Sequence, residues 1–128
     1  MSLRSPLARV LNHGAAHGGV SHWIVERVTA VALAPLSVWL VIALLSLPHT
    51  DYASVSRWAA SGWNPVWLAL LVLLGAWHSW LGVQMVVEDY VHGVLIKTLT
   101  LLLSTFVHGL LALSGVYAVL RIALRGAA

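Results

Sequence analysis

The chain has 128 residues, of which 60% are hydrophobic and 9% are charged, and its mean hydropathy is +0.90. Soluble domains carry charge on roughly a quarter of their residues, so this composition indicates an integral membrane protein with no separate soluble catalytic domain. The net charge of +3 is scattered along the chain, which argues against a nucleic-acid partner, and the lack of cysteine excludes disulfides, thiolate catalysis and iron–sulfur ligation by this chain.

The chain begins with a polar segment, residues 1–27, which is rich in glycine and histidine. It lacks the central apolar run that a cleavable signal peptide requires, so no signal peptide is expected. Residues 28–47 contain no charge and would form a helix about 30 Å long, which matches a hydrocarbon core. They are the predicted first membrane span, and Pro35 is predicted to bend it.

Residues 48–64 mix serines and charged residues with the aromatic residues Tyr52, Trp58 and Trp63. Tyrosine and tryptophan are enriched where a membrane meets water, so this segment is predicted to be a loop at headgroup level. Asn64 and Pro65 then resemble the capping residue and first-turn proline of a second helix.

The remaining sequence predicts two more spans, at about residues 66–87 and 98–120, joined by a short connection at 88–97. The predicted fold class is an all-α membrane protein, with the N-terminal polar segment followed by a three-helix transmembrane domain over residues 28–128. The basic residues divide four to three between the two membrane edges, which weakly places the N-terminus in the cytoplasm. One edge has Arg4, Arg9, Arg27 and Lys97, and the other has Arg57, Arg121 and Arg125.

His78 lies near the middle of the second predicted span, with Gly75 and Gly82 close by on roughly the same face. An ionisable residue inside a membrane usually marks a functional site. A neutral imidazole is a good haem-iron ligand, and small residues let a flat group approach the helix. A structural histidine that hydrogen-bonds between helices explains the spacing equally well, so both interpretations remain open.

Asp89 and Tyr90 end the same helix. Asp89 follows His78 by eleven residues, which is ~16 Å along nearly the same face. A phenol and a carboxylate at this depth could donate a hydrogen bond and relay protons to a lipid-soluble ligand. The alternative is that Tyr90 anchors the helix at the interface and that Asp89 is a solvated helix end.

The ordered set of His78, then Asp89-Tyr90-Val91, preceded by Arg27-Val28-Thr29-Ala30 at the start of the first span, resembles the hydrophobic membrane anchor subunits of succinate dehydrogenase. The resemblance covers almost the whole chain. It implies a non-catalytic subunit of respiratory complex II in the bacterial inner membrane. The implied partners are a flavoprotein subunit, an iron–sulfur subunit, a cytochrome b anchor subunit and membrane lipid.

The resemblance also implies roles for individual residues. His78 would be an axial ligand of haem b, whose other ligand comes from the partner anchor subunit. Tyr90 would contact ubiquinone, and Asp89 would lie beside it on a proton path. Arg27 would pair with a haem propionate or, as we favour, extend to lipid phosphate.

His108 leaves a second possibility open, because antiparallel helices would bring it to about the depth of His78. A haem held by both histidines would make the chain a self-contained cytochrome b. A third possibility is a structural membrane subunit without a cofactor. Fumarate reductase anchors have the same architecture, so the direction of the reaction does not follow from the sequence.

Overall fold

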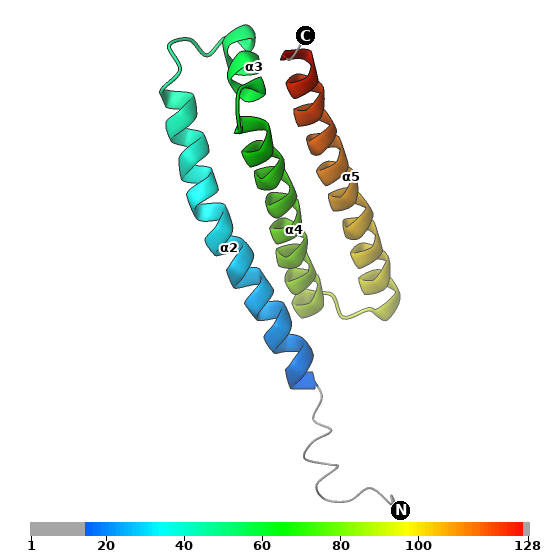
Figure 1. The fold of residues 1–128 in the computed structure, drawn as a ribbon. Coiled ribbons are helices and arrows are strands. Elements are labelled where there is room, and N and C mark those ends of the chain that lie inside the picture. Colours follow the sequence, from blue (N-terminus) through cyan, green and yellow to red (C-terminus); the bar gives the residue numbers. More distant parts are fainter. Residues whose placement is uncertain (1–14, 127–128) are drawn as a thin grey trace, which may run out of the picture.

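The computed structural model describes residues 15–126, and four helices lie in this part of the chain (Figure 1). The predicted all-α membrane fold is confirmed. In chain order the helices are α2 (Ala15–Leu45), α3 (Tyr52–Ala60), α4 (Asn64–Tyr90) and α5 (Val94–Gly126). Residues 1–14, which include Arg4 and Arg9 of the charge count, lie outside the described residues.

Three of these helices are long and apolar enough to cross a membrane, which makes the chain a multi-pass membrane protein. The candidate spans are Val20–Leu45, Asn64–Tyr90 and Val94–Arg125. Each is longer than the stretch predicted from hydropathy, because the helices continue past the apolar core to the membrane edges. Pro35 lies inside α2, which continues through it to Leu45.

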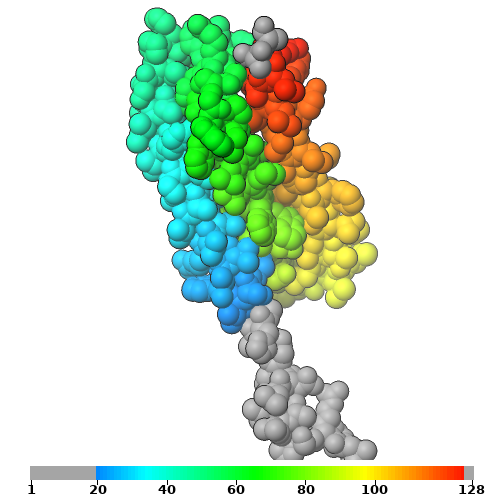
Figure 2. All heavy atoms as spheres, viewed as in Figure 1, coloured from blue at the N-terminus to red at the C-terminus, as the bar shows by residue number. Residues whose placement is uncertain are grey.

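The three spans run antiparallel in one layer, with α4 between α2 and α5 (Figure 1). Figure 2 shows the spans side by side, so each leaves much of its surface uncovered. Among the residues whose side chains are described, the buried apolar ones are Leu36, Ala59, Leu81 and Val87. Such a thin layer suits a protein that faces lipid or further helices, where backbone groups are satisfied within each helix.

Residues 48–64 differ from the predicted loop, because they contain the nine-residue helix α3. Asp51 caps it by accepting hydrogen bonds from the Ser54 amide and hydroxyl, each 2.9 Å long, and these bonds hold the pKa of Asp51 below its usual value. Trp58 of α3 lies 5.8 Å from Trp39 of α2, between ring centroids. This aromatic contact ties α3 to the end of the first span.

The start of α4 also differs from the prediction. Asn64 is the first residue of the helix, not its cap, and its side-chain amide donates to the Trp58 carbonyl at 2.7 Å. Trp63 is the capping residue and makes no side-chain capping bond, while Pro65 lies in the first turn as expected. Asn64 therefore holds α3 against the start of α4.

Helices α4 and α5 approach each other closely where Gly115 faces Val72. A Cβ atom at position 115 would lie 2.5 Å from a Val72 methyl group, which is closer than van der Waals contact allows. Further along the same interface, the Trp80 indole donates to the Thr105 hydroxyl at 3.1 Å. These contacts fix the position of α5 along α4. That position determines which residue of α4 lies opposite His108.

Candidate functional site

His78 meets α2 rather than α5. Its Nδ1 atom lies 2.9 Å from the hydroxyl oxygen of Thr29, whose side chain is 3% exposed. Buried hydroxyl groups commonly join helices inside a membrane, where no water competes for the hydrogen bond. The predicted functional histidine is therefore held in a fixed orientation.

The Thr29 hydroxyl also determines which nitrogen of His78 carries the proton. This hydroxyl donates its one hydrogen to the Glu26 carbonyl, 2.9 Å away. Its oxygen must therefore accept from His78, so Nδ1 carries the hydrogen and Nε2 keeps its lone pair. No side chain in the described part of the chain hydrogen-bonds to Nε2, so this nitrogen is available to a ligand.

The surface of α4 beside His78 is a strip without bulky side chains, formed by Gly75 and Gly82. At 3.6 residues per turn, Gly82 and Gly75 lie about 40° and 60° around the helix from His78. Within residues 20–125, no atom outside their own helical turn lies within 4 Å of where a Cβ would be at either glycine. This glycine strip could accept a flat group or another helix.

His108 belongs to a different interface, although its depth along the bundle matches the prediction. Its Nδ1 donates to the Ser104 carbonyl at 2.8 Å, and its Nε2 accepts from the Ser79 hydroxyl at 3.2 Å. It also lines a cavity of about 410 Å³ between α4 and α5, together with Trp77 and Trp80. His78 does not line that cavity, so the structure does not bring the two imidazoles to one site.

Asp89 and Tyr90 are exposed at the C-terminal end of α4, and Tyr90 is 78% exposed. The Asp89 carboxylate makes no hydrogen bond or ion pair to any described residue. Acidic side chains are disfavoured by the partial negative charge at a helix C-terminus, but here Lys97 donates to the Glu88 carbonyl at 2.9 Å. Both predicted quinone-site side chains are thus uncovered at one membrane edge.

Arg27 lies on α2 between the level of His78 and that edge. Because α2 and α4 are antiparallel and Thr29 meets His78, Arg27 is about 3 Å nearer the Asp89 end. Its guanidinium lies 5.3 Å from the centroid of the Trp23 ring, in cation–π range. The side chain is directed toward the membrane edge.

Thr29 is the residue of this site whose role the sequence reasoning missed. It belongs to the Arg27-Val28-Thr29-Ala30 motif, but a hydrogen bond between this residue and His78 was not predicted. The signal was present, since Thr29 is the one polar residue between Arg27 and Ser37. A lone hydroxyl in an apolar span usually has a hydrogen-bonding partner in another helix.

Comparison with known proteins adds an independent finding. The sequence pattern of the family described as "Succinate dehydrogenase/Fumarate reductase transmembrane subunit" matches residues 1–119. The hydrophobic membrane anchor subunit of succinate dehydrogenase from Rickettsia conorii is 33% identical over 89 residues, which are 69% of this chain and 71% of that protein. The subunit of the same name from Rickettsia bellii is 31% identical over 88 residues, covering 69% and 70%.

Proposed function

Because the chain belongs to the family of succinate dehydrogenase and fumarate reductase transmembrane subunits, we propose that it binds haem b and forms part of a ubiquinone site, in addition to serving as a membrane anchor. Its proposed partners are a flavoprotein subunit, an iron–sulfur subunit and a second, cytochrome b anchor. Its proposed location is the bacterial inner membrane, with the N-terminus in the cytoplasm.

The observation that carries the haem proposal is the hydrogen bond between Thr29 and His78. A histidine that ligates iron through one nitrogen needs an acceptor for the hydrogen on the other, and Thr29 is that acceptor. His78 Nε2 would hold the iron, and Gly75 and Gly82, within about 60° of His78 around the same helix, would leave room for a flat macrocycle. Haem, when bound, supplies one-electron redox chemistry to the complex.

In this proposal the partner anchor subunit would supply the other haem ligand. His108 is a poor candidate, because the lone pair on its Nε2 already accepts the Ser79 hydroxyl. His78 hydrogen-bonds across the interface of α4 with α2, whereas His108 hydrogen-bonds across the interface of α5 with α4. Both facts argue against the alternative of a self-contained two-histidine cytochrome b.

The ubiquinone site would use Tyr90 and Asp89. Reduction of a quinone takes up two protons with two electrons, so a phenol that donates a hydrogen bond and a carboxylate that relays protons are suitable groups. In this proposal Tyr90 and Asp89 handle protons and not electrons, so the electrons would come from the partner iron–sulfur subunit. Of the two roles considered for Arg27, its place over Trp23 favours contact with lipid phosphate over a haem propionate.

Replacing Thr29 by valine is expected to weaken haem binding and to raise the haem midpoint potential. Valine has nearly the same shape but leaves the Nδ1 hydrogen of His78 without an acceptor, so the imidazole becomes a less basic ligand. Losing such a supporting bond typically lowers affinity about 10- to 100-fold. Redox titration of the haem absorbance would measure the shift. Serine at position 29 keeps the hydroxyl and is the control, and a valine variant with unchanged potential and haem content would contradict the role.

Purification of the tagged full-length chain from its native membrane tests the proposed function as a whole. We expect flavin and iron–sulfur absorbance to copurify with the chain, together with haem b. Haem in the chain without partners would support the self-contained cytochrome, and partners without haem would leave an anchor with no cofactor. The absence of both partners and haem would refute the proposal.

A further inference from the structure

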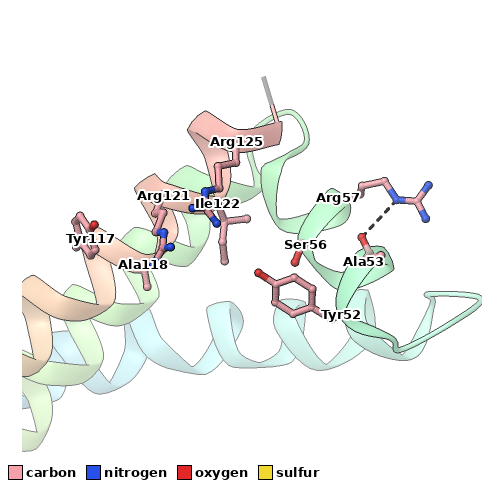
Figure 3. A pocket seen from close by; sticks show the side chains of 9 residues that line it. All are labelled: Tyr52, Ala53, Ser56, Arg57, Tyr117, Ala118, Arg121, Ile122 and Arg125. Carbon is pink, nitrogen blue, oxygen red and sulfur yellow. Dashed lines mark hydrogen bonds between the residues drawn. The ribbon is translucent and has the colours of Figure 1, made fainter. Parts of the chain in front are cut away.

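A second site lies at the membrane edge opposite Asp89 and Tyr90, where α3 faces the last turns of α5 (Figure 3). It is a cavity of about 670 Å³. The side chains that line it are mainly cationic or hydroxyl-bearing. The polar ones used below are Tyr52 and Ser56 from α3, and Tyr117, Arg121 and Arg125 from α5.

Within the described part of the chain, no acidic side chain pairs with the two arginines that α5 contributes to this cavity. Arg121 and Arg125 lie one helical turn apart, and neither makes a hydrogen bond or ion pair within the described residues. Of the chain's four acidic residues, three lie toward the other membrane edge: Glu26, Glu88 and Asp89. The fourth, Asp51, accepts two hydrogen bonds from Ser54 and interacts electrostatically with Arg57 of its own helix, α3.

Arginine at a helix C-terminus can serve simply to balance the helix dipole. That role would not explain why two guanidinium groups share one cavity with the hydroxyls of a separate helix. Guanidinium groups bind phosphate with paired hydrogen bonds, and hydroxyl groups donate to the remaining phosphate oxygens. The lining therefore has the chemistry of a phosphate site.

The row of residues that leads out of the cavity points to a lipid rather than a soluble phosphate. Side chains four residues apart are neighbours on a helix, about 40° apart around its axis, so an apolar residue, an aromatic residue and two cations follow one another in a row that winds through about 120° from the bilayer to its edge. These are Leu113, Tyr117, Arg121 and Arg125. Leu113 is 71% exposed, and the cavity wall also includes Ala118 and Ile122.

This order of polarity is that of a phospholipid, from acyl chain through glycerol to phosphate. We propose that the cavity between α3 and α5 binds the headgroup phosphate of an anionic phospholipid, with an acyl chain lying along Leu113. The site is separate from the proposed haem and quinone residues. Basic pockets between membrane helices are suited to such headgroups.

Arg57 provides a matched control at the same membrane edge. Figure 3 shows its guanidinium directed away from Arg121 and Arg125, and its Nε donates to the Ala53 carbonyl at 3.3 Å. Arg57 is one of the residues that line the cavity, but its guanidinium does not point toward the two arginines of α5. Replacing Arg57 by glutamine removes one positive charge from this membrane edge but leaves Arg121 and Arg125 in the cavity.

The test is binding of phosphatidylglycerol to the delipidated assembly purified through the full-length chain, counted by native mass spectrometry. We expect affinity at one site to fall about five-fold in Arg121→Gln or Arg125→Gln and about 25-fold in the double variant, and to fall by less than either single variant in Arg57→Gln, whose guanidinium points away. Phosphatidylcholine with the same acyl chains should bind this site more weakly. Excess inorganic phosphate should not displace the lipid.

Four results would overturn the proposal. They are equal binding by the double variant and the unmodified chain, equal loss in Arg57→Gln and the double variant, equal binding of phosphatidylcholine and phosphatidylglycerol to the unmodified chain, and complete displacement by inorganic phosphate. The comparison of the two lipids and the displacement by inorganic phosphate both use the unmodified chain, so these two tests do not depend on how the variants fold.

Discussion

Replacing Tyr90 by phenylalanine is expected to slow ubiquinone reduction by about 100-fold while succinate oxidation by a soluble artificial acceptor continues at its normal rate. Phenylalanine keeps the ring but removes the hydroxyl that would donate to the quinone. Tyr90 is 78% exposed and ends α4, so the substitution removes no contact within the described structure. The two rates, measured on the same membranes, separate quinone chemistry from the flavoprotein reaction.

The control is Trp63→Phe, which trims an exposed aromatic side chain at the opposite membrane edge. Trp63 makes no side-chain capping bond and lies outside both the proposed quinone site and the lipid cavity. Its variant should reduce ubiquinone normally. If Tyr90→Phe also turned over quinone at the normal rate, Tyr90 would be an interfacial anchor and not a quinone contact.

The sequence predicted the spans well because their signal is local. A run of about twenty apolar residues indicates a membrane span by its length and composition alone, independently of the rest of the chain. The helix ends were less well predicted, since the helices continue into polar segments at the membrane edges. The helix α3 was missed because its nine residues are rich in serine and aromatic residues, although Asp51 followed by Ser54 was a capping signal.

The depth of each site residue was predictable, but its neighbours were not. Position along a helix follows from counting residues, so His108 could be expected at the level of His78, and its hydrogen bond to Ser79 agrees with that. Which helix a side chain meets depends on rotation, and a span that is apolar on all sides carries no hydrophobic stripe to set it. His78 turns to Thr29 on α2, whereas Ser79, about 100° further round, meets His108 on α5.

Replacing His78 by alanine is expected to remove nearly all haem b from the assembly. The variant lacks the nitrogen that would ligate iron, and the neutral hydroxyl of Thr29 is not among the usual ligands of haem iron. His108 cannot take over, since its Nε2 accepts from Ser79 on another interface. His108→Ala is the matched control, because it removes an imidazole of similar depth and should leave haem content unchanged.

The ratio of haem b to flavin in the purified assembly tests this account most directly. Reduced-minus-oxidised spectra give the haem, and the flavin counts the assemblies, so a variant that assembles poorly is not mistaken for one that lacks haem. We predict a ratio near zero for His78→Ala and an unchanged ratio for His108→Ala. Equal loss of haem in the two variants, or full haem content in His78→Ala, would contradict the assignment of His78 as the ligand that this chain provides.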